Sequence, residues 1–228
     1  MKRLLLLMVL LSGIWACKKQ ITTQKQEIPE SNSAQQKKEN KGIAQSSPFI
    51  KELVTFANIK ANDSSDIDKL FQVKIIDSTG KIFPSNITEG IDLYKKAVTS
   101  QQQITLPIFE IANSDQVILF AVGKGYMDVI WAKILINKNS QEISKIAFDH
   151  KAESEGYGAE ITYATFENKF TGTKISLTQN TFGLMQNGKN LIKGDKKIDG
   201  ISGATITSHA VIQMLNERLK KYQSYLLD

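Results

Sequence analysis

A run of small and hydroxyl residues, Asp-Gly-Ile-Ser-Gly-Ala-Thr-Ile-Thr-Ser, occupies positions 199–208, next to a predicted C-terminal helix. The first turn of a helix has backbone amides without an intrahelical partner, and the helix dipole adds positive potential, so a phosphate can bind there. Small residues also let a ligand approach the backbone closely. The residues alone leave two interpretations: a phosphate-binding loop, or a plain capping loop in which Thr207 or Ser208 is the N-cap.

A second glycine-containing stretch, Glu-Ser-Glu-Gly-Tyr-Gly-Ala-Glu, occupies positions 153–160, and His150 precedes it. A third, Gly-Lys-Gly-Tyr-Met at 123–127, interrupts an apolar run. This third stretch lacks the last glycine and the following helix of a dinucleotide-binding fingerprint, so we do not expect NADH to bind here. His150 could hydrogen-bond a cofactor, and a polar residue at a strand end explains it equally simply.

The segment 199–205 resembles the flavinylation motif of the FMN-binding domain family, which includes the C subunit of sodium-translocating NADH:quinone reductase and the G subunit of the Rnf complex. The resemblance implies FMN joined to Thr205 by a phosphoester, and a flavin transferase that installs it and reads Asp199. The stretch 153–160 resembles a family loop beside the flavin, and 123–127 a Gly-x-Gly-Leu-Trp turn. The implied cofactor-binding residues are Thr205, Asp199, Ser202, Gly203, Ala204, Glu153, Gly156, Tyr157, Gly158, Ala159 and Glu160.

Three positions depart from the family pattern. Glu155 stands where proline is usual, Tyr157 where leucine is usual, and Met127 where tryptophan is usual. The resemblance covers about residues 100–228, and residues 49–99 more loosely. The departures motivate an alternative function, a non-redox lipoprotein that serves as a binding or scaffold module and keeps the fold without flavin.

The first residues have the pattern of an export signal. Lys2 and Arg3 precede a mostly apolar run of thirteen residues, 4–16, whereas a membrane-spanning helix needs about 20. Cys17 follows, and Ile-Trp-Ala-Cys at 14–17 resembles a bacterial lipobox. The resemblance implies a lipoprotein signal peptide at 1–16 and lipidation of Cys17, which would anchor the protein on the extracytoplasmic, periplasmic face of a bacterial membrane. A short hydrophobic anchor with an incidental cysteine is the alternative.

Residues 17–48 are rich in lysine, glutamine and serine, and we expect a lipidated cysteine followed by a flexible polar tether, because such a segment buries too little apolar surface to fold. Much of the net charge of +6 lies there, so a nucleic-acid partner is not expected. These lysines could lie along anionic lipid headgroups or simply be solvated. One cysteine and two distant histidines argue against a disulfide framework and a metal site.

From position 49 onward the hydrophobic pattern predicts one α+β domain, residues 49–228. Helical periodicity indicates helices at 49–57, 87–97, 159–170 and 208–226. Runs of β-branched residues indicate strands at 73–76, 81–83, 104–111, 117–122, 129–136, 143–148 and 174–177. Because short turns join most of these strands, we expect an antiparallel sheet flanked by helices, with a long C-terminal helix after the 199–205 loop. The apolar stripe of that helix comprises Val211, Met214, Leu215, Leu219 and Tyr222.

With the family resemblance, these features predict a membrane-anchored extracytoplasmic electron carrier with covalent FMN, part of or related to an Nqr/Rnf-type complex coupled to sodium or ion transport. The flavin would transfer electrons and the protein would position it. The expected partners are a flavin transferase, and either membrane redox subunits or an extracytoplasmic electron acceptor. No constellation of acid, base and nucleophile supports an oxidoreductase with its own small substrate, so we expect a redox subunit of an NADH:quinone reductase-type oxidoreductase.

Overall fold

The computed structural model describes residues 47–60, 67–100, 105–176 and 178–227. The predicted signal peptide, Cys17 and nearly all of the predicted tether lie outside the described residues. The helices are α2 (Pro48–Phe56), α3 (Ile67–Leu70), α4 (Ile87–Ser100), the 3-10 helix η1 (Gly158–Thr162), α5 (Ala164–Glu167), α6 (Thr205–Lys221) and α7 (Gln223–Leu227). The strands are β1 (Phe71–Asp77), β2 (Ile82–Pro84), β3 (Thr105–Ile111), β4 (Gln116–Lys124), β5 (Val129–Asn137), β6 (Glu142–His150), β7 (Phe182–Gln186), β8 (Lys189–Ile192) and β9 (Lys196–Asp199).

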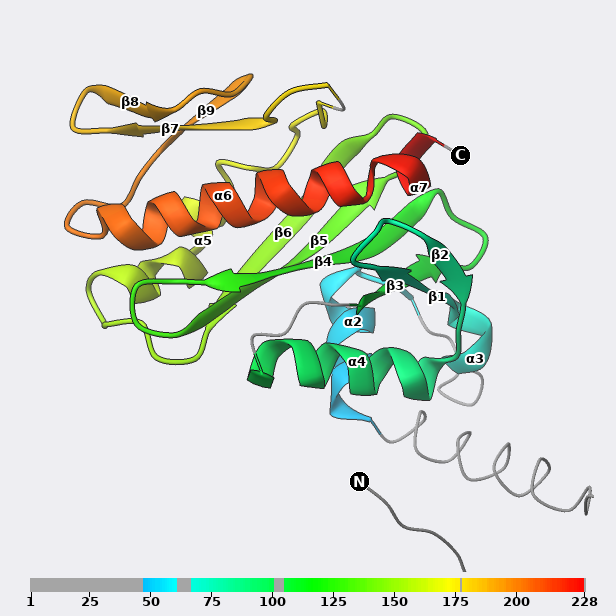
Figure 1. Ribbon diagram of the computed structural model, residues 1–228. Helices are drawn as coiled ribbons and strands as arrows, with labels where there is room; N and C mark the ends of the chain where they lie inside the picture. The colour runs from blue at the N-terminus through cyan, green and yellow to red at the C-terminus, as the bar shows by residue number, and fades with distance from the viewer. Residues whose placement is uncertain (1–46, 61–66, 101–104, 177, 228) are drawn as a thin grey trace, which may run out of the picture.

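Six strands form one antiparallel sheet in the order β2-β1-β3-β4-β5-β6. Strands β3 to β6 follow one another along the chain, and a short connection joins each to the next, which only antiparallel pairing permits. Helices lie against both faces of this sheet, and α6 is the longest of them (Figure 1). The predicted fold class, an antiparallel sheet flanked by helices with a long C-terminal helix, is confirmed.

The central strands are buried on both faces, and alternate residues face different cores. In β4, Val117, Leu119 and Ala121 belong to the core under α6, whereas Ile118 and Phe120 belong to the core under α2 and α4. A strand covered on both sides reads as a continuous apolar run, because neither face needs polar side chains. This burial explains why β4 and β5 were easy to recognise in the sequence.

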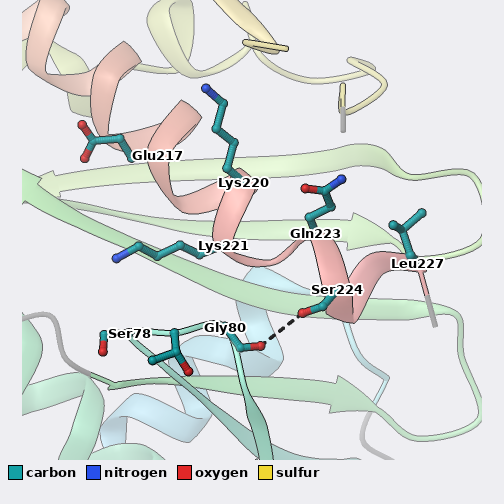
Figure 2. A pocket seen from close by; sticks show the side chains of 9 residues that line it. Ser78, Gly80, Glu217, Lys220, Lys221, Gln223, Ser224 and Leu227 are labelled. Atoms are coloured by element: carbon teal, nitrogen blue, oxygen red, sulfur yellow. Dashed lines mark hydrogen bonds between the residues drawn. The ribbon is translucent and has the colours of Figure 1, made fainter. Parts of the chain in front are cut away.

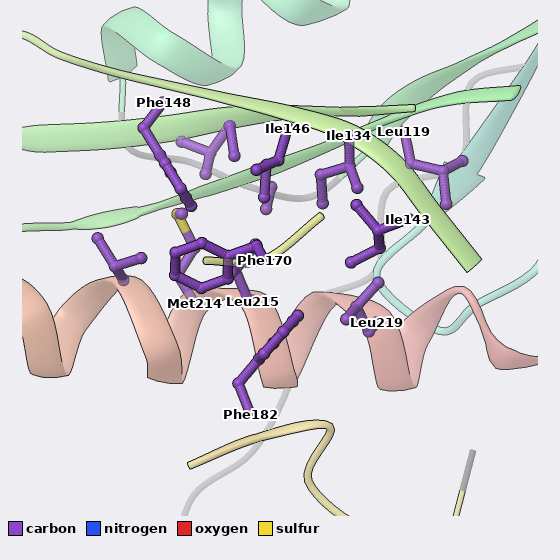
Figure 3. Packing of buried hydrophobic residues seen from close by; sticks show 14 of the residues in the cluster. Leu119, Ile134, Ile143, Ile146, Phe148, Phe170, Phe182, Met214, Leu215 and Leu219 are labelled. Atoms are coloured by element: carbon purple, nitrogen blue, oxygen red, sulfur yellow. The ribbon is translucent and has the colours of Figure 1, made fainter. Parts of the chain in front are cut away.

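Helix α6 lies between the large sheet and a small sheet formed by β7, β8 and β9 (Figure 1). Its predicted apolar stripe is buried, and Met214, Leu215 and Leu219 pack with Ile143 and Phe170 (Figure 3). All the side chains labelled in Figure 3 belong to this core under α6, which holds the helix in a fixed place. The position of residue 205 is therefore set by packing along the whole helix.

The small sheet was not predicted. Strand β7 pairs antiparallel with β8 and parallel with β9, in the order β8-β7-β9. Asn216 of α6 completes the pairing of β7, because its amide accepts a hydrogen bond from the Phe182 N–H (3.0 Å) and donates one to the Phe182 carbonyl (2.8 Å). Strand β9 ends at Asp199, so the small sheet leads the chain directly into the loop that precedes α6.

Three predicted elements differ from the structure. The predicted helix 159–170 is two short pieces, η1 and α5, separated at Tyr163, whose extended backbone interrupts the helix. The predicted strand at 174–177 is wrong as far as it is described, because Lys174 makes only an isolated bridge with Glu142, the first residue of β6. The C-terminal helix begins at Thr205, three residues earlier than predicted, and α7 continues after it.

Within the described ranges, no helix combines the length and the apolar composition that crossing a membrane requires. Helix α2 joins the core through four buried side chains, Phe49, Ile50, Leu53 and Phe56. These side chains pack with α4 against the face of the sheet opposite α6.

Candidate functional site

A pocket of about 530 Å³ lies where four segments distant in sequence meet. They are the β4–β5 turn, the loop that follows β6, the β7–β8 turn and the first turn of α6. The three glycine-containing stretches that the sequence singled out thus converge on one place. The lining residues are Tyr126, Glu153, Ser154, Tyr157, Gly158, Asn187, Gly203, Ala204, Thr205, Ile206 and Thr207.

Thr205 is the first residue of α6 and is exposed at the pocket. The N-cap residue is Ala204, and no side chain caps the helix. The Ser208 N–H donates to the Ala204 carbonyl (2.9 Å) and begins the intrahelical ladder, so the amides of residues 205–207 precede that ladder. This end of the pocket therefore presents a hydroxyl group and positive helix-end potential together.

The predicted N-cap role of Thr207 and Ser208 is wrong, because both hydroxyls have other partners. Thr207 donates to the Glu153 carboxylate (2.7 Å), and the Ser208 hydroxyl accepts a hydrogen bond from the Ile201 N–H (2.9 Å). Both side chains are buried, with 2% and 0% exposure. Because the helix begins at Thr205, Thr207 and Ser208 lie within its first turn and not at the capping position.

Buried contacts hold the loop before α6 in shape. The Gln186 side-chain amide donates to the Ile201 carbonyl (3.0 Å), and the Gly200 N–H donates to the Met185 carbonyl (2.9 Å). A Cβ at Gly200 would lie 1.8 Å from Gln186 Oε1, so any other residue there would displace the Gln186 side chain that bonds to the loop. The loop is thus fixed at residues 200 and 201, while Ser202, Gly203 and Thr205 remain exposed.

Gly203 and Tyr157 bring two of the predicted motifs into contact. Gly203 has φ +76°, a backbone conformation that side-chain-bearing residues rarely adopt. A Cβ at this position would lie 2.9 Å from Tyr157 Cδ1 and 3.0 Å from Cε1. The tyrosine ring, 56% exposed, therefore lies against the glycine and forms one side of the pocket.

Glu153 is a buried carboxylate, 6% exposed, at the centre of the site. Its Oε1 accepts hydrogen bonds from the Met127 N–H (2.8 Å) and the Asp128 N–H (3.4 Å), and its Oε2 accepts the bond from Thr207. Gly125 and Gly158 leave room for it, since a Cβ at either would come within 2.5 Å of a carboxylate oxygen. These glycines serve the carboxylate directly, which gives a physical reason for glycine in two of the motifs.

Other predicted site residues lie around the pocket without lining it. Asp199 is exposed at the end of β9, and its carbonyl accepts a hydrogen bond from Lys169 Nζ (2.8 Å). Ala159 is buried, and Glu160 is half-buried in η1. The remaining two, Ser202 and Gly156, are exposed turn residues.

His150 also lies outside the lining of the pocket. Its Nδ1 accepts a hydrogen bond from the Glu153 N–H (3.1 Å), so it holds the backbone of the loop. The Asn-Gly pair at 187–188 was a usable signal that sequence reasoning missed, because this pair favours a hairpin turn, here the one between β7 and β8. The lining residues absent from the predicted site are Tyr126, Ser154, Asn187, Ile206 and Thr207.

The groups with displaced pKa values lie away from this pocket. Burial raises the pKa of Tyr222, whose hydroxyl donates to the Phe120 carbonyl (2.9 Å). Burial and the hydrogen bond to Glu110 raise the pKa of Tyr225. Burial alone would raise the pKa of Glu110, but the hydrogen bonds from Lys74 and Tyr225 outweigh it and leave that pKa lowered. Among the described residues, no three histidine, cysteine or acidic side chains come together as metal ligands.

Another pocket, of about 650 Å³, lies at the opposite end of α6, between its last turn, α7 and the β1–β2 turn. The Ser224 hydroxyl donates to the Gly80 carbonyl across it (3.1 Å), and Lys220 and Lys221 point in different directions (Figure 2). None of the predicted site residues lines it. Of these two pockets, the one at the start of α6 is therefore the pocket that the sequence motifs line.

Comparison with known proteins shows what the chain is similar to. Residues 125–220 match the model of the FMN-binding domain family. The chain is 27% identical over 176 residues to the C subunit of the Na(+)-translocating NADH-quinone reductase of Chlamydia caviae, covering 62% of this chain and 55% of that protein. It is 26% identical over 102 residues to the corresponding protein of Haemophilus ducreyi, covering 45% and 40%. The chain thus spans about half the length of the curated relatives it matches.

Two solved structures are similar in fold. The C subunit of the Na(+)-translocating NADH-quinone reductase from Parabacteroides distasonis has a TM-score of 0.60 at 25% sequence identity, covering 88% of this chain and 98% of that one. Shewanella oneidensis NqrC has a TM-score of 0.59 at 16% identity, covering 78% and 96%, and shows the fold alone. In sequence and in fold, the chain therefore resembles the FMN-binding domain family and the C subunits of Na(+)-translocating NADH-quinone reductases.

Proposed function

We propose that this protein is an electron carrier whose FMN is attached through a phosphoester to the hydroxyl of Thr205. The observation that supports this most strongly is the placement of Thr205, exposed at the first turn of α6 on a pocket that all three sequence motifs line. When bound, FMN supplies the chemistry, because its ring accepts and donates electrons. The protein residues attach it, orient it and surround it.

The residues present fit such a group at both of its ends. A phosphate joined to Thr205 would meet the uncapped amides at the start of α6, where the helix dipole favours negative charge. A flat aromatic ring would meet the exposed side chains of Tyr126, Tyr157 and Ile206, which are 60%, 56% and 59% exposed. Ligand pockets typically have volumes of about 300–1,000 Å³, and this one is about 530 Å³.

The departures at Met127, Glu155 and Tyr157 are compatible with this role. Tyr157 supplies a larger and flatter surface than leucine at the pocket, and the Met127 side chain is exposed while its amide is bound by Glu153. Glu155 is exposed and does not line the pocket. Of the three residues, only Tyr157 lines the pocket.

Installation of the flavin would require a flavin transferase that acts on the folded loop. Asp199, the residue we expect the transferase to read, is exposed beside the fixed residues 200 and 201. Because the hydrogen bonds to Ile201 and Gly200 hold the loop before any cofactor is attached, the transferase would meet Thr205 in a fixed position.

We further propose that the domain works at a bacterial membrane as part of, or related to, an Nqr-type complex coupled to sodium or ion transport. The curated relatives are named subunits of Na(+)-translocating NADH-quinone reductases, which supports membrane redox subunits as partners. The lipobox-like sequence ending at Cys17 supports a lipid anchor that places residues 49–228 on the extracytoplasmic side. In this role the chain passes electrons between protein partners and does not act as a stand-alone enzyme.

The test is an intact-mass measurement of residues 18–228 co-expressed with a flavin transferase. We expect the mass of one FMN less one water in the wild type and in Thr165→Ala, a matched change of an exposed threonine in α5, and no added mass in Thr205→Ala. A wild type that gains no mass, with a transferase active on a known substrate, would refute the proposal and favour the non-redox binding module.

A further inference from the structure

Thr207 and Glu153 are joined by a buried hydrogen bond although 54 positions separate them in sequence. The bond measures 2.7 Å between Thr207 Oγ1 and Glu153 Oε2, and the other carboxylate oxygen, Oε1, accepts from the Met127 N–H at 2.8 Å. One acidic side chain thus connects the first turn of α6, the loop after β6 and the β4–β5 turn. We call this connection the Thr207–Glu153 bridge.

A carboxylate is expensive to bury unless donors surround it. Two backbone N–H groups and one hydroxyl donate to the Glu153 oxygens, and no lysine or arginine of the described residues is among the donors. Within the described part of the chain, hydrogen-bond donors, and no partner charge, therefore compensate the burial of this carboxylate. A domain needs no such group for stability, since an apolar residue would avoid the cost of burial.

The three segments that the bridge joins are three of the four that form the pocket at Thr205. Tyr126 and Thr207 each line the pocket and lie beside or within the hydrogen-bonded network. Thr207 is also only two residues from Thr205, so a change in its position moves the attachment residue. Gly125 and Gly158 preserve space for the carboxylate, as a Cβ on either would overlap it.

We propose that Thr207 and Glu153 are positioning residues for the flavin: the bridge fixes the pocket walls relative to Thr205 and keeps one negative charge beside the ring. This inference rests on the proposed attachment of FMN to Thr205. Because reduction adds negative charge to the flavin, a fixed carboxylate nearby disfavours the reduced form and lowers the midpoint potential. Thr207 acts through the position of Glu153 and of the first turn of α6, so it is a positioning residue and not a catalytic residue.

The first experiment measures the midpoint potential and visible spectrum of the flavinylated protein. Thr207→Val keeps the branched shape and removes the hydroxyl, Thr207→Ser restores the hydroxyl, and Glu153→Gln removes the charge while keeping the size. We expect Glu153→Gln to raise the midpoint potential, Thr207→Val to alter the potential and the flavin spectrum, and Thr207→Ser to restore wild-type values. Thr181→Val, a buried hydrogen-bonded threonine in another part of the fold, is the control and should leave the flavin properties unchanged.

The second experiment needs no flavin. In the Thr205→Ala background, the Met127 N–H should exchange with solvent about tenfold faster when Thr207→Val is added, because a carboxylate that loses one partner holds the other less firmly. Thr207→Ser should keep the slow exchange. If Thr207→Val does not fold, the midpoint potentials of Glu153→Gln and Thr207→Ser are compared instead. A raised potential in Glu153→Gln with a wild-type potential in Thr207→Ser supports the inference, and equal potentials in the two variants contradict it.

The outcomes separate this inference from the proposed function. If the wild type gains no FMN, the proposed function is wrong, and the inference that rests on it is wrong too. If the wild type is flavinylated but Glu153→Gln and Thr207→Val keep the wild-type potential, spectrum and Met127 exchange, the bridge is only structural and the inference is wrong.

Discussion

Substitution of Gly203 by alanine tests whether the contact between the attachment loop and Tyr157 shapes the site. Gly203 has φ +76°, which an alanine adopts at a cost of about 1 kcal/mol. The new Cβ would lie 2.9 Å from Tyr157 Cδ1, whereas carbon atoms in contact lie about 3.5 Å apart, so the ring must move by about 0.6 Å. Because the ring is 56% exposed, it can move without disturbing the core.

Two other glycines provide matched controls. Gly156 has φ +72° and Gly172 has φ +74°, and a Cβ at either would meet nothing within 4 Å. All three alanine variants should therefore lose about 1 kcal/mol of unfolding free energy, within a few tenths of one another. Only Gly203→Ala should also displace a wall of the pocket, and such a misplacement should slow flavin attachment by on the order of tenfold.

The assay combines urea denaturation of each variant with the time course of FMN incorporation by a flavin transferase, followed by intact mass. Attachment to Gly203→Ala at the wild-type rate would refute the reasoning, because the Tyr157 contact would then have no effect on the site. An equal loss in Gly172→Ala would also refute it, since the effect would come from stability alone. A loss in Gly156→Ala but not in Gly172→Ala would place the sensitivity in the loop backbone.

Two further predictions concern the core. Burial raises the pKa of Tyr94, Tyr222 and Tyr225, so the stability these tyrosines contribute is complete below about pH 10 and is lost as the pH rises above the unfolded-state value. Above that value, each tyrosine should lower the free energy of unfolding by about 1.4 kcal/mol per pH unit. Urea denaturation between about pH 10 and 12 should therefore show that the free energy of unfolding of Tyr222→Phe falls less steeply with pH than that of the wild type, by this amount. The same pH dependence in both proteins would contradict this. Leu215→Ala, at a site with 0% exposure, should cost about 2–5 kcal/mol in the same assay at neutral pH, and a loss below about 1 kcal/mol would mean that α6 is not held by this core.

The strands that are buried on both faces of the sheet were predictable from the sequence. In β4 and β5, both cores need apolar residues, so the strands appear as uninterrupted apolar runs. The small sheet was missed for the opposite reason. Residues 189–191 of β8 are exposed and mostly polar, so the hydrophobic pattern there resembles that of a loop, and only its pairing with β7 makes it a strand.

The start of α6 was placed three residues late because capping propensity favoured Thr207 and Ser208. Those hydroxyls are bound instead by Glu153 and Ile201, through contacts that are decided by packing and are invisible to local sequence rules. The helix consequently begins at Thr205 without a side-chain cap. That difference changes the chemistry, because it places the candidate attachment residue at the uncapped end itself.

The sequence by itself indicated which segments are candidates for chemistry, because the small, hydroxyl and glycine residues at 199–208 and 153–160 form a local pattern along the chain. Tertiary structure alone decided that these segments share one pocket with the β4–β5 turn, and that Glu153 lies buried between Met127 and Thr207. The physical reason is distance along the chain. Local propensity acts over a few residues, whereas the contacts that bury this carboxylate join positions 26 and 54 residues apart and form only when the sheet and α6 pack together.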